Sequence, residues 1–558
     1  MVRARLAGII AAAALLFTTS QAFADGPPGA AVATAHPLAT DAAVEILDQG
    51  GNAFDAAVAA TAALAVVEPY GSGIGGGGFW LLHREADDFQ TMVDGRETAP
   101  GQATRDMYLD ESGEVRGRDS LDGPLAAGIP GTPAALVHIT DEYGELDLAT
   151  NLEPAIRYAR DGFEVGEHYR RMIRFRLDAV RDSPAAAAVL LDDGEVPEEG
   201  HTIVQTDLAL TLERLARDGL DGFYRGDVAE RLVRGTNEAG GIWSMDDLAD
   251  YAVVEREPVQ GTYQGLRITS AAPPSAGGIS LMTMLNILSQ HELRNKPEAE
   301  RIHLKVEAMR RAYRDRQLFL GDPDFVDIPI ERLTSMAHAE AIGADVELDR
   351  ATPSEDLPEP EREGEDTTHF SIIDRDGNRV GATLSINYPF GSGFMPPGSG
   401  VLLNNEMDDF ASQPGKPNAY GLVGGEANAI EPGKRPLSSM TPTFVESDDR
   451  VAVIGSPGGS RIITQVLLGV ISFSDHLEPE QWVARPRFHH QYLPDKIEHE
   501  PGAISVQTRR ALTAKGHTVR PMLRRYGDMQ VAFWNRGDGV MDAVSDPRGG
   551  GEGRVTDE

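Results

Sequence analysis

An acidic, proline-rich segment, residues 351–366, separates two parts of the chain that are both rich in core-forming residues. Its sequence, ATPSEDLPEPEREGED, has almost nothing to bury, so we expect it to form an exposed linker. Two β-prone runs follow directly, residues 367–373 and 380–387, with an Asp-Gly-Asn turn signal between them. This pattern predicts a β-hairpin. The chain is therefore expected to pass from an exposed linker into a buried hairpin at residue 367.

The turn determines which residues of the predicted hairpin face each other. With a two-residue Asp-Gly loop, Thr368 lies opposite Ser385 and Thr367 lies opposite Ile386. The hairpin would then bring Ser385 and Asn387 close to Thr367. Which face each side chain takes depends on the register, because a shift of one residue exchanges the two faces.

A threonine hydroxyl is a weak nucleophile unless a base lies beside it. If Thr367 began a chain, its own α-amine, with an unperturbed pKa of roughly 7.7–8.0, would be that base. An internal threonine becomes N-terminal when its hydroxyl attacks the preceding carbonyl, here that of Asp366, and the resulting ester hydrolyses. The flexible linker before Thr367 suits this step, but most Thr-Thr pairs at strand starts are only β-formers. From these residues alone, both interpretations stay open.

The rest of the sequence predicts a large helical content around a few strands. Apolar periodicity predicts two helices within residues 37–67, separated by Gly-Gly-Asn at 50–52. The glycine run 71–78 enters an apolar strand and lacks the Lys and Ser/Thr of a phosphate loop, which favours tight backbone packing. Further helices are predicted at residues 126–180, 205–235, 279–288 and 301–318.

The N-terminus and the composition limit the classes of protein. Residues 1–24 combine Arg3 and Arg5, an apolar run and an Ala-Phe-Ala cleavage site, which predicts a signal peptide and export to a periplasm or the extracellular space. We expect no membrane anchor in the mature form, because the apolar run is shorter than a bilayer span. The chain has no cysteine, which excludes disulfides and thiolate chemistry. A net charge of −36 argues against nucleic acid as a partner.

The motifs after residue 366 resemble a known family. TTHFSIIDRDGN, ATLSIN, FGSG and GVLLNNEMDDF, within residues 367–410, closely resemble the start of the small subunit of γ-glutamyltranspeptidases. The resemblance covers nearly the whole chain after the signal peptide. Its further motifs are Gly-rich 75–79, Gly-Arg-Glu 95–97, Pro-Gly-Thr 130–132, GDPDF 321–325, KRPLSSMTP 434–442 and GSPGGS 455–460.

This resemblance implies a fold and a domain organisation. The family belongs to the N-terminal-nucleophile hydrolases, so the implied fold is α+β, a four-layer αββα sandwich. The implied precursor is cut between Asp366 and Thr367. Residues 25–366, which end in the acidic linker, would form a large subunit, and residues 367–558 would form a small catalytic subunit. The two would make one intertwined domain, a heterodimer.

The resemblance also implies roles for individual residues. Thr367 matches the nucleophile, Ser385 matches a hydroxyl that bonds it, and Gly458 and Gly459 match the oxyanion hole. Ser385 stands where several relatives have threonine, and serine lacks the methyl group that restricts the rotamer. The residues that match substrate-binding positions are Arg96, Ser438 and Ser439 for the α-carboxylate, Asn387, Glu406 and Asp409 for the α-ammonium, and Tyr420 as the gate of a lid loop.

The implied activity is transfer of the γ-glutamyl group of glutathione and related compounds to water, amino acids or peptides. A free amino acid head group needs one cation and one anion, which Arg96 and Asp409 supply. The implied chemistry needs no metal or cofactor; His489 and His490 lack a third ligand nearby in sequence, and His369 is expected to be structural. Two alternatives remain, a glutaryl or cephalosporin acylase on the same fold and an inactive, acidic binding protein.

Overall fold

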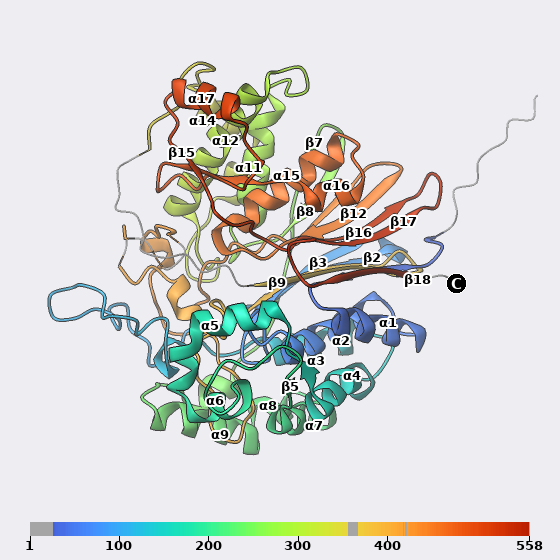
Figure 1. Ribbon diagram of the computed structural model, residues 1–558, viewed down its shortest axis with the longest axis vertical. Coiled ribbons are helices and arrows are strands. Elements are labelled where there is room, and N and C mark those ends of the chain that lie inside the picture. The colour runs from blue at the N-terminus through green and yellow to red at the C-terminus, as the bar shows by residue number, and fades with distance from the viewer. Residues whose placement is uncertain (1–25, 355–366, 414, 417, 419–420, 557–558) are drawn as a thin grey trace, which may run out of the picture.

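The protein is described by a computed structural model that covers residues 26–354, 367–413, 415–416, 418 and 421–556. Two β-sheets lie face to face at the centre, and helices cover the outer face of each sheet (Figure 1). The architecture is an α+β, four-layer αββα sandwich, which confirms the predicted fold. The predicted signal peptide, residues 1–24, and most of the predicted linker lie outside the described residues.

The first sheet has seven strands, and all neighbours in it are antiparallel. Its side chains alternate between two cores, as a two-sided sheet requires: Phe79 and Leu81 face the second sheet, whereas Trp80 and Leu82 face the helices. In spatial order the strands are β18 (Glu552–Thr556), β1 (Ala30–Thr34), β9 (Thr368–Ile373), β10 (Arg379–Ser385), β2 (Gly77–Arg84), β3 (Phe89–Gly95) and β6 (Val254–Arg256).

The second sheet has six strands and packs on the first through contacts of β9 with its central strands. Both sheets combine strands from before and after Thr367, so neither part of the chain can complete a sheet by itself. In spatial order the strands are β17 (Met541–Ser545), β16 (Gln530–Asn535), β12 (Arg450–Gly455), β11 (Thr443–Glu446), β8 (Leu266–Ser270) and β7 (Val259–Tyr263).

Two helical layers enclose the sheets. Alanine-rich α1 and α2 pack on the first sheet, and the side chain of Asn52 caps α2 by accepting from the N–H groups of Phe54 and Asp55. On the second sheet lie α11 and α15, with α12 packed against α11. The longer helices are α1 (Pro37–Asp48), α2 (Ala53–Val67), α3 (Thr132–Tyr143), α4 (Leu148–Asp161), α5 (Glu167–Arg181), α7 (Thr206–Asp218), α9 (Gly226–Glu238), α11 (Gly277–Ser289), α12 (Glu298–Phe319) and α15 (Ile462–Ser474).

Shorter elements complete the structure at its periphery. The sequence-predicted helices and their break at residues 50–52 are present. The remaining elements are α6 (Pro184–Leu190), α8 (Asp221–Tyr224), α10 (Met245–Ala249), α13 (Ile330–Leu333), α14 (Met336–Gly343), α16 (Pro479–Ala484), α17 (Val506–Ala514), β4 (Phe163–Glu164), β5 (Thr202–Ile203), β13 (Phe488–His489), β14 (Ile497–His499) and β15 (Val519–Pro521). Within the described residues, no helix is both long and apolar enough to cross a bilayer.

The predicted hairpin is present as β9 and β10, but its predicted register was wrong by one residue. Thr368 pairs with Leu384, not with Ser385. The loop has three residues rather than two, because the N–H of Asp374 donates to the carbonyl of Asn378 and Gly377 takes a left-handed conformation with φ 86°. The Asp374 carboxylate holds this longer turn by accepting from the backbone N–H groups of residues 376 and 378. Thr367 is therefore level with Ser385 rather than with Ile386.

The glycine run before β2 permits close contact between backbones, as predicted. A Cβ atom on Gly75 would lie 2.1 Å from the carbonyl oxygen of Leu402, and one on Gly76 would lie 2.2 Å from that of Ser385. No side chain fits at either position. The run therefore allows the start of β2 to lie in close backbone contact with the end of β10, where Ser385 is located.

Candidate active site

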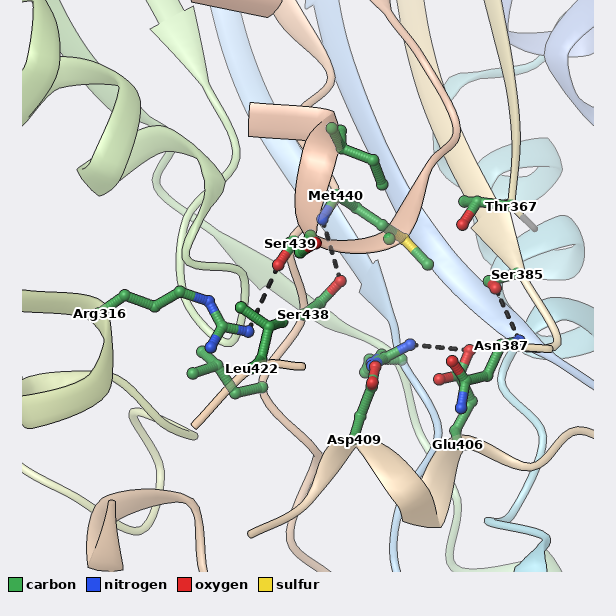
Figure 2. Close-up of a pocket in the computed structure, with 15 residues that line it drawn as sticks. Arg316, Thr367, Ser385, Asn387, Glu406, Asp409, Leu422, Ser438, Ser439 and Met440 are labelled. Carbon is green, nitrogen blue, oxygen red and sulfur yellow. Dashed lines mark hydrogen bonds and ion pairs between the residues drawn. The ribbon is translucent and has the colours of Figure 1, made fainter. Parts of the chain in front are cut away.

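Thr367 lines a small cavity of about 20 Å³. It directly precedes β9, and its side chain points towards this cavity, near Ser385 (Figure 2). The cavity brings together most of the residues that sequence comparison with the family singled out: Arg96, Thr367, Ser385, Asn387, Glu406, Asp409, Ser438, Ser439 and Gly459.

Ser385 ends β10 beside Thr367, and Asn387 follows two residues later. Both are buried, and the backbone N–H of Asn387 donates to Ser385 Oγ at 2.7 Å. Asn387 has a positive φ of 72°, and its Nδ2 donates to the carbonyl of Asn405 at 2.9 Å. These bonds fix the Ser385 hydroxyl without the methyl group that a threonine would use for the same purpose.

Arg96 follows β3 and is fully buried among carboxylates. Its NH2 group bonds the Asp409 carboxylate, and its NH1 group lies 2.9 Å from Glu406 Oε1 and 3.6 Å from Glu97 Oε2. Its Nε donates to the carbonyl of Pro436 at 3.2 Å. Burial lowers the pKa of Arg96, but the three acids outweigh this effect and hold it above its usual value.

Burial affects two of the acids around Arg96 strongly. Burial raises the pKa of Glu97 to about 8 and that of Glu406 well above its usual range, although Arg96 opposes both shifts. The Glu97 carboxyl group is therefore mainly neutral near pH 7, and burial shifts Glu406 in the same direction. Asp409, in the short helix Glu406–Asp409 with Glu406, is more exposed, at 14 % of its side chain. The Arg96–Asp409 ion pair therefore lies in the wall of the cavity.

Ser438 and Ser439 form the opposite wall of the cavity. Ser438 Oγ accepts from the backbone N–H of Met440 at 3.1 Å, which orients its hydroxyl. Ser439 Oγ accepts from NH2 of Arg316 at 3.3 Å (Figure 2). Sequence reasoning missed Arg316. Ala312 and Tyr313 lie on a buried face of α12, and Arg316 follows them at helical spacing. This spacing is the signal from which its burial could have been predicted.

The turn at Gly458 and Gly459 passes beside Thr367. Gly459 lines the small cavity with Thr367, and Pro457 lines a larger cavity that also reaches Thr367. Gly458 has a φ of 131°, and Gly459 opens the short helix Gly459–Arg461, which runs into α15. N–H groups at such a helix start have no partner within the helix and favour negative charge.

A larger cavity of about 580 Å³ opens on the other side of Thr367. Glu68, at the end of α2, lies there and accepts a hydrogen bond of 2.7 Å from the hydroxyl of Thr368. Burial raises the pKa of Glu68 to about 7. Four cationic side chains also line this cavity: Arg171, Arg524, Arg525 and Arg548.

The histidines singled out in the sequence are buried and hydrogen-bonded. His369 contacts Thr383 Oγ1 at 2.8 Å, and burial lowers its pKa to about 3, so it is neutral and structural as predicted. His489 and His490 contact Thr464 and Asp495. Asp366 and Tyr420 lie outside the described residues.

One group of potential metal ligands occurs in the described part of the chain: His303, Glu307 and His517. The two histidines are hydrogen-bonded to each other at 2.8 Å, and Glu307 is paired with Arg311 at 2.6 Å. This group lies away from the residues that line the Thr367 cavity.

Comparisons with known proteins agree with this geometry. The family model described as Gamma-glutamyltranspeptidase matches residues 39–556. The glutathione hydrolase proenzyme of Escherichia coli (strain K12) is 42% identical over 525 residues, which cover 93% of this chain and 90% of that protein. The acylase ACY 1 proenzyme of Pseudomonas sp. (strain SE83) is 35% identical over 540 residues, with 95% and 94% covered.

Solved structures show the same architecture. The cephalosporin acylase from Bacillus halodurans matches with a TM-score of 0.84 and 26% identity, over 96% of this chain and 97% of that one. The sequence match extends over almost the whole described fold, and it includes both the Thr367 hairpin and the Arg96 site. The chain therefore belongs to the γ-glutamyltranspeptidase family of N-terminal-nucleophile hydrolases and is an enzyme.

Proposed function

We propose that this enzyme is a γ-glutamyltransferase and glutathione hydrolase whose nucleophile is Thr367. The observation that carries the proposal is that Thr367 and the Arg96–Asp409 ion pair line the same small cavity, with Arg96 fully buried. A γ-glutamyl group ends in a free amino acid head, which carries one negative and one positive charge. A site with both a cation and an anion, placed beyond a nucleophile, complements such a head group.

The two charged groups of the head group would bind to different walls of the cavity. Its α-carboxylate would bind Arg96 and the hydroxyls of Ser438 and Ser439. Its α-ammonium would bind Asp409, with Glu406 and Asn387 as further polar partners. Because the cavity measures only about 20 Å³, the substrate has to displace the direct contacts between Arg96 and Asp409. Arg96 then pairs with the α-carboxylate of the substrate instead of with Asp409, and Asp409 pairs with the α-ammonium instead of with Arg96.

Activation of the enzyme would be a cut between Asp366 and Thr367. The Thr367 hydroxyl attacks the Asp366 carbonyl, the C–N bond breaks as the amine takes a proton, and water hydrolyses the ester. Residues 25–366 and 367–558 then form the two subunits of a heterodimer. The word proenzyme in the names of the relatives from E. coli and Pseudomonas supports a processed precursor.

The catalytic cycle would use the new N-terminus. Thr367 Oγ attacks the γ-carbonyl of glutathione, and the α-amine of Thr367 takes the hydroxyl proton. N–H groups of Gly458 and Gly459 stabilise the oxyanion, and the amine returns the proton to the departing cysteinylglycine. Water, an amino acid or a peptide then attacks the γ-glutamyl ester and regenerates Thr367. Each step uses groups of the chain itself.

The larger cavity would hold the leaving group and the acceptor. Both are amino acids or peptides with a free carboxylate, which suits the arginine side chains that line this cavity. We also propose that residues 1–24 direct export, so that the enzyme acts in a periplasm or outside the cell.

The similarity to two acylases favours a second candidate, hydrolysis of glutaryl or cephalosporin amides. A glutaryl group lacks the α-ammonium, so it needs no anion at position 409. We expect the wild-type enzyme to prefer a γ-glutamyl anilide to a glutaryl anilide. Asp409→Asn should reduce kcat/KM for the γ-glutamyl anilide about 100-fold and leave that for the glutaryl anilide within about 3-fold. A wild-type preference for the glutaryl compound would favour the acylase assignment.

A further inference from the structure

A second guanidinium, that of Arg316 on α12, lies in the wall of the Thr367 cavity. Arg316 is 4 % exposed, and it also lines a neighbouring cavity of about 210 Å³ together with Asp409 and Leu422. Figure 2 shows its side chain extending from α12 to Ser439. The side chain therefore stands where a ligand in the cavity would contact it.

The surroundings of Arg316 differ from those of Arg96. Three carboxyl groups lie within ion-pair distance of Arg96. Within the part of the chain that the structure describes, Arg316 forms no ion pair; NH2 bonds only Ser439 Oγ, and the buried Nε has no hydrogen-bond partner. Burial lowers the pKa of Arg316; Tyr313 and Asp409 oppose this shift, and Arg96 adds repulsion. A buried cation without a direct ion pair is costly, so an anionic ligand would stabilise it.

The charged groups of the cavity suit a ligand that brings one negative charge to the two guanidinium groups. Burial raises the pKa of Glu97 and Glu406, which favours their neutral forms, whereas Asp409 pairs with Arg96 and lines both cavities together with Arg316. If Asp409 binds the α-ammonium of the substrate, both guanidinium groups face the remaining charge of the head group, its α-carboxylate.

We propose that Arg316 binds the α-carboxylate of the substrate, as a second guanidinium beside Arg96 and next to Ser439. The inference rests on the proposed function, because it assumes a γ-glutamyl head group in this cavity. It makes Arg316 a residue that determines specificity for a carboxylate at the α-position.

The test pairs two substrates that differ only in this group. The first is γ-glutamyl anilide, and the second is 4-aminobutanoyl anilide, in which hydrogen replaces the α-carboxylate. Arg316→Gln should lower kcat/KM for the first about 10- to 100-fold, mainly through KM, because it removes a charged hydrogen-bonding group. It should change kcat/KM for the second by less than about 3-fold. Arg314→Gln, an exposed position on the same helix, is the matched control and should change neither.

Equal losses on both substrates would overturn the proposal, because they would mean that Arg316 only supports the fold. If Arg316→Gln does not fold or mature, Arg316→Lys provides the same test with a smaller expected loss, about 10-fold, on the γ-glutamyl substrate alone. Equal losses in the lysine variant would again reject the role. A wild-type enzyme that ignores γ-glutamyl anilide would instead reject the proposed function, so the two failures are distinguishable.

Discussion

At the residue scale, the hydroxyl of Ser385 is held by its own turn. The N–H of Asn387 donates to it, so the absence of the threonine methyl group should have little effect. We expect Ser385→Thr to keep kcat within about 3-fold of the wild type. Ser385→Ala should lower kcat about 10- to 100-fold, because the hydroxyl proposed to orient Thr367 is lost. Steady-state kinetics on γ-glutamyl anilide measure both. A gain of more than about 10-fold in the threonine variant would show that the serine hydroxyl is not fixed.

Glu68 gives the second residue-scale prediction, which concerns stability. Burial raises its pKa from 4.5 to about 7 in the folded protein, so folding favours the protonated acid. This contribution is complete below pH 4.5 and is lost as the pH rises through about 7. We expect Glu68→Gln, which resembles the protonated acid, to remove up to about 3 kcal/mol of this pH dependence. Denaturant unfolding at pH 5 and pH 8 tests it: parallel changes in wild type and variant would contradict the assigned pKa.

At the element scale, the two sheets are in close contact where His369 of β9 packs on Gly455 of β12. A Cβ atom on Gly455 would lie 2.2 Å from His369 Cε1. We expect Gly455→Ala to reduce the free energy of unfolding by about 1–3 kcal/mol, because it overpacks this contact. It should also slow the cut before Thr367, because β9 positions that residue. Gly550→Ala, which meets nothing within 4 Å, is the control. Unaffected stability in the first variant would show that the sheets can separate locally.

The elements also show which parts of the fold can be predicted from the sequence. Apolar periodicity and the Gly-Gly-Asn break predicted α1 and α2. The absence of a phosphate-loop lysine indicated that the glycine run permits close backbone packing. The hairpin register was wrong because the buried Asp374 side chain, not the Asp-Gly pair, determines the length of the loop. The sequence did not single out Glu68 and Arg316, because each comes to lie in a cavity with Thr367 only when distant segments pack together.

At the scale of the whole molecule, strands from the two sides of residue 367 are interleaved within one sheet. β9 lies beside β1, and β10 lies beside β2, so both neighbours of the hairpin come from the preceding part of the chain. A cut before Thr367 would break one covalent bond but none of these strand pairings. The two products should therefore stay associated until the protein unfolds.

The most direct measurement is intact-mass analysis with N-terminal sequencing of the purified protein after native size-exclusion chromatography. The account predicts two chains in a single peak, one of which begins with Thr367. Thr367→Ala should yield one uncut chain at the same elution volume, with no activity on γ-glutamyl anilide. A wild-type protein that hydrolyses this substrate as a single uncut chain, or a normally cut and active alanine variant, would contradict the assignment of Thr367 as the nucleophile.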